Sequence, residues 1–437
     1  MCGTRTPNGT AFTKLILGFF GFLGFFGFLA QEVQAASASV TLRLDHHLIA
    51  VKAKDVRSWQ TPEEVWLYNG NPIVPAASWR VDGDTAPALP AGVTRTEKLA
   101  WNRGVIAEAI RTQASPKIDR MAKSVTISRA ASGMIVFDGV GLPGRSIDVP
   151  AATQLVIAAL ESGAKEVWMP VIQTPAKVTV LDAELASKGI KEVVTVGESD
   201  FSNSPANRIH NINVGLRRFN AHRIPQGSTF SFLDVLGPVD GTTGYKKELV
   251  IKGDRTVPDF GGGLCQVSTT AYRGVWEYGF PIVRRQNHSF SVNHYMPVGT
   301  DATVFTSGPD VQFLNDSPGD LLMQTYAEGD FAYFIYYGTK DTRETQLIGP
   351  FTWDHRSPPS PRTEYTADLA PGARRKVGDP VAGLKAMWFR IVQKDGKELV
   401  EPVFSSYAAR PLFYQVGTAA ATGSGELASP EAVDVAG

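Results

Sequence analysis

The most constraining stretch of this sequence is a run of three glycines at residues 261–263, followed at once by Leu264 and Cys265. Because consecutive glycines are poor helix formers, a helix is predicted to begin at about Leu264. Apolar residues then recur at a spacing of four, and Gly279 stands where that pattern ends. The sequence therefore predicts a helix that ends just before Gly279 and carries Cys265 in its first turn.

This position favours a reactive thiol at Cys265. The unpaired backbone N–H groups and the positive end of the helix dipole favour an anion in the first turn of a helix. A thiolate is such an anion, and its pKa can fall from about 8.5 into the ~3.5–7.5 range at such a site. The same N–H groups could bind an oxyanion formed when a thiolate attacks a carbonyl. The alternative is a small buried hydrophobic residue, as most free cysteines are.

The N-terminal residues 1–35 predict a secretory signal peptide. Arg5 and Lys14 precede an uncharged stretch at residues 15–30 that is rich in Phe, Leu and Gly, and a small-residue cleavage site follows at residues 33–35. The uncharged stretch is shorter than the ~20 residues that span a bilayer. An uncleaved membrane anchor is the alternative, and only in that case is a membrane an expected partner. The predicted location is the cell envelope outside the cytoplasm.

Removal of this segment would leave Cys265 as the single cysteine, because the other cysteine of the chain is Cys2. A secreted protein with one thiol cannot form an internal disulfide. A lone thiol outside the cytoplasm is exposed to oxidation, so its presence favours a catalytic explanation.

Charge and histidine spacing exclude two classes of partner. Lys and Arg together number 43, as do Asp and Glu, so the formal net charge is zero, which argues against binding to nucleic acid. His46 and His47 have no further ligands at a suitable spacing, so the sequence predicts no metal site and no cofactor.

The remaining sequence predicts an α+β protein. Thr61 to Glu64 has the pattern of a helix start, Asp148 that of a helix N-cap, and Asp395-Gly396 that of a tight hairpin turn. The small, polar and acidic composition at the C-terminus predicts disorder. The predicted parts are an N-terminal α/β domain (40–182), a central α+β domain containing the cysteine helix (183–340), a β-rich C-terminal subdomain (341–417) and a disordered tail (418–437).

A nucleophilic cysteine needs a base within hydrogen-bond reach, and the base needs an orienting group. His288 is the first choice for the base, because only a helix and one strand separate it from Cys265 in the sequence. His294 is the second choice. Asp301 or Ser289 could hold the imidazole in the required tautomer.

Three segments resemble the signature of the VanW family. They are Gly-Gly-Gly-Leu-Cys-Gln-Val-Ser-Thr-Thr at residues 261–270, His-Ser at 288–289 and Asp-Ala-Thr-Val at 301–304. The resemblance spans about residues 185–337. Gly-Arg-Ser-Ile-Asp-Val at residues 144–149 is similar, more weakly, to a peptidoglycan-binding-like domain that often precedes VanW domains.

The resemblance implies a role in bacterial cell-wall metabolism and a link to glycopeptide resistance. It implies an L,D-transpeptidase-like enzyme that acts on peptidoglycan stem peptides, with Cys265 as nucleophile and His288 as its partner. The residues predicted to be catalytic are Cys265, His288 and Asp301. Leu264 departs from the more usual isoleucine. Arginine suits carboxylate recognition, and the three glycines would let a peptide approach the backbone closely. The residues expected to contact substrate are Gly261, Gly262, Gly263, Gln266, Ser268, Ser289 and Arg285.

Three hypotheses follow for the function of this chain. In the first, the Cys265 thiolate forms a thioester with a stem peptide and passes the acyl group to an amine. In the second, water accepts the acyl group, so the protein is a cysteine peptidase of the wall. In the third, Cys265 is packed in the core of a non-catalytic wall-binding module.

Overall fold

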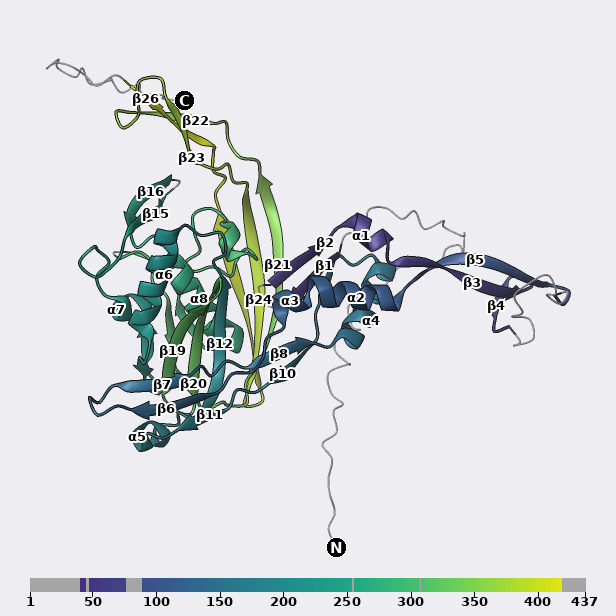
Figure 1. Ribbon diagram of the computed structural model, residues 1–437, viewed down its shortest axis with the longest axis horizontal. Helices are drawn as coiled ribbons and strands as arrows, with labels where there is room; N and C mark the ends of the chain where they lie inside the picture. The colour runs from purple at the N-terminus through teal and green to yellow at the C-terminus, as the bar shows by residue number, and fades with distance from the viewer. Residues whose placement is uncertain (1–39, 45–46, 76–88, 254, 307, 419–437) are drawn as a thin grey trace, which may run out of the picture.

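The computed structural model describes residues 40–44, 47–75, 89–253, 255–306 and 308–418 (Figure 1). The predicted signal peptide, the predicted tail beyond residue 418 and His46 lie outside the described residues. The described chain mixes helices with many short strands, which confirms the predicted α+β class. Within those ranges no helix has both the length and the apolar character that a membrane span requires.

The N-terminal part contains a small helix-covered sheet and a long hairpin that reaches away from it (Figure 1). Side chains from the sheet of β2, β1 and β9 and from the helices form one buried apolar cluster. Asp148 caps α4, as predicted, by accepting a hydrogen bond from the Ala151 N–H at 3.1 Å. The elements are β1 (Val40–Leu44), β2 (His47–Val51), α1 (Ala53–Arg57), β3 (Gln60–Tyr68), β4 (Asn71–Ile73), β5 (Val93–Trp101), α2 (Arg103–Gln113), α3 (Ser115–Ile118), β6 (Val125–Arg129), β7 (Ile135–Gly139), β8 (Gly144–Ile147), α4 (Val149–Ser162), β9 (Glu166–Trp168), β10 (Val171–Thr174) and β11 (Val178–Val180).

The helix start predicted at Thr61 to Glu64 is wrong. These residues lie inside β3, which pairs antiparallel with β5 along its whole length. Pairing with a strand more than thirty residues away is a long-range interaction, and it overrides the local Thr-Pro-Glu-Glu pattern.

The central part is built on an antiparallel sheet in the order β12-β20-β19-β13. Helices α6 and α8 pack together on this sheet and share its apolar cluster. The elements are α5 (Ala183–Ser187), β12 (Glu192–Asp200), α6 (Ala206–Phe219), β13 (Arg223–Ile224), β14 (Thr229–Ser231), α7 (Phe232–Leu236), β15 (Lys247–Lys252), β16 (Arg255–Phe260), α8 (Leu264–Tyr278), β17 (Ile282–Arg284), the 3-10 helix η2 (Asn293–Tyr295), β18 (Gln312–Leu314), β19 (Leu321–Glu328) and β20 (Phe331–Gly338).

Strands β6, β7 and β11 of the N-terminal part pack against this central sheet. A buried cluster joins Val125 and Ile127 of β6 to Ile190, Ile335 and Tyr337 on the central side. Hydrophobic packing therefore continues across the predicted domain boundary near residue 182, and the boundary itself stays a prediction.

A buried carboxylate also connects the two parts. Glu198 of β12 accepts hydrogen bonds from Arg120 and from Arg145, and its Oε1 lies 3.0 Å from His47 Nε2. Burial would raise the pKa of Glu198, but the charges of Arg145, His47 and Arg120 hold that pKa well below its usual range. Because removing one partner of a buried ionic group is costly, this cluster fixes the N-terminal segment against β12.

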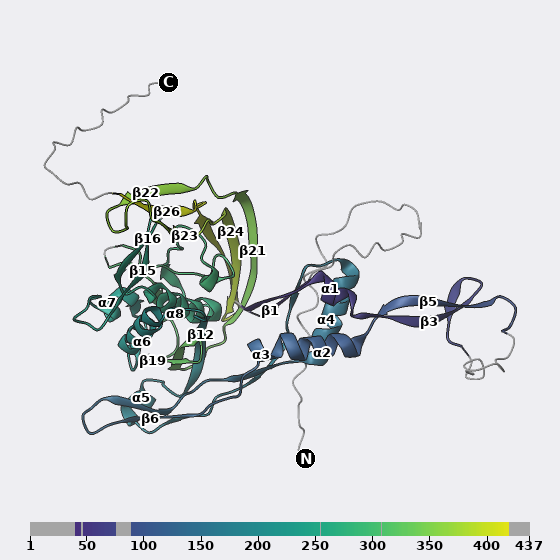
Figure 2. The same ribbon diagram turned by 45° about the horizontal axis from the view of Figure 1, so that its top comes forward.

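The C-terminal part is a long three-stranded sheet that curves around α8, followed by a second small sheet (Figure 2). Its elements are β21 (Glu344–Arg356), β22 (Arg362–Thr366), β23 (Arg374–Gly378), β24 (Gly383–Lys394), β25 (Lys397–Tyr407) and β26 (Phe413–Gly417). The hairpin predicted at Asp395-Gly396 is confirmed by the pairing of β24 with β25. Arg390 of β24 donates to the carbonyls of Trp276 and Phe280, at 3.1 and 2.9 Å, so the sheet holds the end of α8.

Helix α8 lies very close to β12 where two glycines meet. A Cβ atom added to Gly274 would stand 2.5 Å from the Gly197 backbone nitrogen, and one added to Gly197 would overlap the Thr270 carbonyl oxygen. Backbone atoms cannot yield as a flexible side chain can, so this crossing requires both glycines. This close contact sets the distance between α8 and the sheet.

We expect Gly274→Ala to destabilise the protein by about 1–3 kcal/mol, the usual cost of overpacking, despite the better helix propensity of alanine. Gly104→Ala in α2 is the matched control, because a Cβ there meets only the Asn102 side chain, at 3.3 Å. The control is expected to be neutral or stabilising. Urea unfolding of the two variants measures the difference, and equal midpoints would contradict the close crossing.

Candidate active site

Cys265 is the second residue of α8. The preceding Gly263 has a φ of +114°, a left-handed conformation that side chains rarely adopt. A Cβ on Gly262 would stand 2.7 Å from the Leu249 carbonyl oxygen of β15, and one on Gly263 would stand 3.1 Å from Arg208. The glycines therefore let the start of α8 pack against β15 and α6. The three glycines also line the cavity described below, so this packing role comes in addition to the predicted contact with substrate, which stays a prediction.

The thiol is half-buried and is surrounded by polar groups. Cys265 Sγ lies 3.4 Å from Thr303 Oγ1 and 3.8 Å from the Val304 carbonyl oxygen. The N–H groups of Leu264 and Gln266 donate to Gly261 and Gly263. In the part of the chain that the structure describes, the Cys265 N–H has no hydrogen-bond acceptor, so it is the first-turn donor next to the sulfur that an oxyanion could use.

His288 lies on the loop after β17 and is 2% exposed. Its Nδ1 is 2.6 Å from Asp301 Oδ2, and its backbone N–H donates to the same oxygen at 2.8 Å. A carboxylate can only accept, so Nδ1 carries the proton and Nε2 is left for another partner. Nε2 is buried and meets no acceptor at hydrogen-bond geometry among the described residues, yet the ring interacts electrostatically with Cys265. Tyr295 stacks on the imidazole, with ring centroids 4.7 Å apart.

The thiol and the imidazole shift each other's pKa values. Burial alone would raise the pKa of Cys265, but the positive charge of His288, together with the contacts to Thr303 and Val304, lowers it to about 7. Burial would lower the pKa of His288, but the negative charge of Cys265 and the hydrogen bond and charge of Asp301 raise it to about 9. A thiolate and an imidazolium therefore coexist between about pH 7 and pH 9.

Asp301 is a buried carboxylate with four donors. Besides His288, its Oδ1 accepts from the Tyr407 hydroxyl and, at 3.3 Å, from Arg285. Burial would raise the pKa of Asp301, but the hydrogen bond and charge of His288 and the charge of Arg285 hold it well below its usual range. Sequence reasoning missed Tyr407 because it lies at the end of β25, and no local pattern brings it near residue 301.

Four residues predicted to contact substrate have other partners and do not line the cavity described below. Gln266 is completely buried and donates to Ser199 Oγ at 2.7 Å, and Ser268 Oγ donates to the Ala302 carbonyl at 2.7 Å. The other two of the four residues are Arg285 and Ser289. Arg285 donates to the Asp301 carbonyl at 2.7 Å and to the Gly299 carbonyl at 3.0 Å, and Ser289 donates to the Gly253 carbonyl at 2.5 Å. None of the four side chains lines this cavity and each bonds to other groups of the protein, so the structure does not support their predicted contact with substrate.

His294, the second candidate base, lines the same cavity from η2. Burial and the charge of Arg208 lower its pKa. No hydrogen bond joins it to Cys265 or Asp301 among the described residues, so His288 is the better candidate for the base.

Cys265 and His288 open into a cavity of about 350 Å³ between the β15–β16 hairpin, α6, α7 and η2. Most of its wall is apolar, which is typical of a site that binds a small molecule or a peptide end. The lining residues are Pro205, Arg208, Leu233, Leu236, Val239, Glu248, Leu249, Val250, Ile251, Asp259, Phe260, Gly261, Gly262, Gly263, Leu264, Cys265, His288, Val292, His294, Tyr295, Val304, Phe305 and Thr306.

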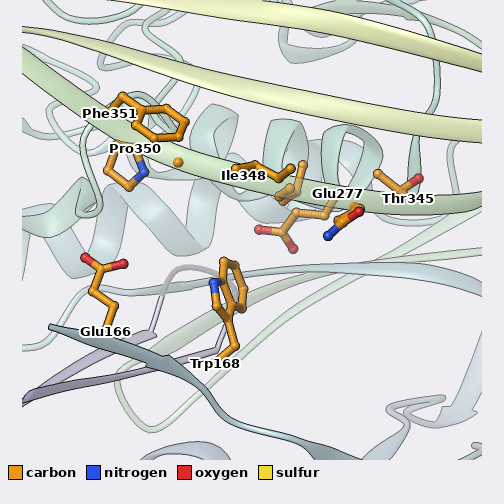
Figure 3. Close-up of a pocket in the computed structure, with 10 residues that line it drawn as sticks. Glu166, Trp168, Glu277, Thr345, Ile348, Pro350 and Phe351 are labelled. Atoms are coloured by element: carbon orange, nitrogen blue, oxygen red, sulfur yellow. The ribbon is translucent and has the colours of Figure 1, made fainter. Parts of the chain in front are cut away.

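A larger and more open depression of about 710 Å³ lies between β9 and β21. Figure 3 shows Glu166 and Trp168 on one side of it and Ile348 and Phe351 on the other. Its lining residues include two glutamates but neither cysteine nor histidine, so it does not contain the thiol and imidazole that the smaller cavity brings together.

Residues 207–336 match the family model described as VanW like protein, and this range contains Cys265, His288 and Asp301. The chain is 32% identical over 179 residues to the uncharacterized protein YoaR of Bacillus subtilis (strain 168), covering 40% of this chain and 57% of that protein. It is 27% identical over 115 residues to the Vancomycin B-type resistance protein VanW of Enterococcus faecalis (strain ATCC 700802 / V583), covering 25% of this chain and 42% of that protein. The matches thus span about half the length of these relatives.

One solved structure, described as the IgA1 protease G5 domain structure, is 23% identical to this chain. The match covers 18% of this chain and 94% of that one, with a TM-score of 0.12. A value this low carries no argument about the fold or the function.

We expect iodoacetamide to alkylate Cys265 with a rate that rises through a midpoint near pH 7 and then levels off, because the thiolate forms above the lowered pKa. In His288→Asn, burial remains while the positive charge is lost, so the midpoint should move above about 8.5. Mass spectrometry of the Cys265 peptide separates this reaction from that of Cys2. A wild-type midpoint above 8.5, or no shift in the variant, would contradict the ion pair.

Thr303→Val tests the hydrogen bond to sulfur separately. Valine keeps the shape of threonine but cannot donate, so the thiolate loses one stabilising contact. The alkylation midpoint is expected to rise by less than about one pH unit, because the 3.4 Å contact is long. A Thr303→Ser variant, which keeps the hydroxyl, should leave the midpoint near that of the wild type.

Proposed function

We propose that this chain, which carries a VanW-like domain at residues 207–336, is a bacterial cell-envelope enzyme that transfers acyl groups of peptidoglycan stem peptides through a thioester on Cys265. The observation that supports this most is that Cys265 and His288 line one cavity, while the buried Asp301 holds the His288 imidazole through its Nδ1. One of the two relatives bears the name of a vancomycin resistance protein, which favours a substrate in the cell wall.

In the proposed first step, the Cys265 thiolate attacks the carbonyl carbon that joins an L-centre to a D-residue. The new C–S bond pushes an electron pair onto the carbonyl oxygen, and the Cys265 N–H faces that charge. The imidazolium of His288 gives its Nε2 proton to the departing nitrogen as the C–N bond breaks. A thioester and a free D-residue result.

In the proposed second step, an acceptor amine attacks the thioester. Neutral His288 takes the proton from the amine nitrogen, and the C–S bond breaks to restore the thiolate. The product is an amide cross-link between two stem peptides. The mostly apolar wall of the cavity limits water at the thioester, which favours an amine over water as acceptor.

The hydrogen bond from His288 Nδ1 to Asp301 fixes the orientation of the imidazole throughout these steps. Asp301 holds Nδ1, so only Nε2 can exchange protons with the substrate. A cysteine that served only as core packing would not need a buried imidazole held in one tautomer. This supports an enzymatic reading over a passive wall-binding module.

We expect a tetrapeptide donor to leave an adduct on the intact protein whose added mass equals the donor minus the D-amino acid that is released. Cys265→Ala should form none, and His288→Asn should react about 10²–10⁴-fold more slowly, the usual contribution of a general acid–base. Ser289→Ala is the control for the fold, because Ser289 neighbours His288 but does not line the cavity. The acylation rate should be bell-shaped, with limbs near pH 7 and pH 9.

Adding an acceptor amine then separates the hypotheses. A cross-linked product supports transfer, whereas release of the free tripeptide with or without amine supports hydrolysis. A protein that forms no adduct with any stem peptide is not an enzyme of this kind, and the non-catalytic module would remain.

A further inference from the structure

Arg208 of α6 is a positively charged side chain on the wall of the Cys265 cavity. Its guanidinium donates to Ser204 Oγ, to Gln266 Oε1 at 2.8 Å and to the Tyr295 hydroxyl at 3.5 Å. These contacts come from the loop before α6, from α8 and from η2, so they hold the guanidinium in one place. A charged group held in this way at a cavity wall is arranged for binding.

Gln266 helps to hold the Arg208 guanidinium in its position. It directly follows the nucleophile, yet it is completely buried and faces away from the cavity. Its amide nitrogen donates to Ser199 Oγ and to the Asp200 carbonyl, at 2.7 and 3.2 Å, which leaves its oxygen directed at Arg208. The glutamine after the cysteine is therefore a positioning residue for the arginine.

Among the described residues, no salt bridge joins Arg208 to a carboxylate. All three of its hydrogen-bond partners are neutral oxygens, those of Ser204, Gln266 and Tyr295. The carboxylates that line the cavity, Glu248 and Asp259, come from the β15–β16 hairpin and would repel an anion. Among the charged groups of the cavity wall, Arg208 is thus the one suited to receive a carboxylate.

The position of Arg208 indicates which carboxylate it would receive. The Tyr295 hydroxyl accepts a hydrogen bond from Arg208, and the Tyr295 ring stacks on the His288 ring. In the proposed reaction, His288 protonates the departing nitrogen, so the leaving residue lies on the His288 side of the thiol. Arg208 therefore borders the leaving-group side of the cavity.

We propose that Arg208 binds the free C-terminal carboxylate of the leaving residue, so that the donor must end one residue beyond the bond that is broken. The inference rests on the proposed function and names its substrate class: peptides with a free terminal carboxylate. Longer donors and donors with a blocked C-terminus are poor substrates, because they place an uncharged amide against an unbalanced cation.

Two donor peptides that differ only at the C-terminus, a free acid and a carboxamide, test this. Formation of the Cys265 thioester by each is followed by intact mass, and the acid-to-amide ratio of kcat/KM is the readout. The wild-type protein should prefer the acid by about 10- to 100-fold, the range expected for hydrogen bonds between charged groups.

Arg208→Met should bring this ratio close to one, whereas Arg208→Lys should keep part of the preference, because lysine retains the charge but not the planar pair of donors. Arg217→Met is the matched control, an exposed arginine on the same helix that does not line the cavity, and its ratio should equal that of the wild type. General loss of stability lowers both rates together and does not move the ratio.

The outcomes are distinct. A wild-type protein that forms the thioester equally well with both peptides overturns this inference and leaves the proposed function standing, as does an unchanged ratio in Arg208→Met. A wild-type protein that forms no thioester with either peptide overturns the proposed function and the inference with it.

Discussion

The buried carboxylate of Asp301 is the interaction on which the candidate site depends. One of its oxygens accepts from the ring and the backbone of His288, and the other accepts from Tyr407 and Arg285. A buried charge needs such a set of donors, because each missing one would leave the cost of desolvation uncompensated. The donors come from the loop after β17 and from the last residue of β25, so the site forms only when the central part and the C-terminal sheet are joined. The predicted division near residue 341 therefore separates two segments that the Asp301 carboxylate connects.

Helix α8 carries the thiol and also contacts the segment that follows Asp301, so it sets the position of one relative to the other. Its second turn holds the segment after Asp301, because Ser268 donates to the Ala302 carbonyl and Thr269 accepts from the Ala302 N–H at 3.0 Å. The same segment brings Thr303 to the sulfur. The helix in turn cannot shift, since Gly274 fixes it against β12 and Arg390 holds its last carbonyls. Cys265, His288 and Asp301 are thus positioned by α8 and by the segment between β17 and β18, and packing far from the thiol holds the helix in place.

Sequence reasoning located the parts of this arrangement that depend on local patterns. The glycine run and the spacing of apolar residues determine where α8 begins, and the short path from the cysteine to His288 allows them to meet. Which polar side chains face the cavity could not be predicted in the same way. Gln266 and Ser268 follow the cysteine on the same helix, but their buried acceptors lie on β12 and near residue 302, and only the folded chain shows this. Tyr407 and Arg208 lack any local signal, because each reaches the site from an element distant in sequence.

The balance of charges distinguishes this thiol from a passive core cysteine. Burial acts against a thiolate and, by itself, would raise the pKa of Cys265 above its ordinary value. A lowered pKa therefore requires a nearby positive charge strong enough to outweigh desolvation, and His288 can carry that charge in a buried position only because Asp301 stabilises it. Asp301 therefore raises the pKa of His288, and the charged His288 in turn lowers the pKa of Cys265. A protein that used Cys265 only to fill space would gain nothing from burying two charged groups beside it, because each adds a desolvation cost.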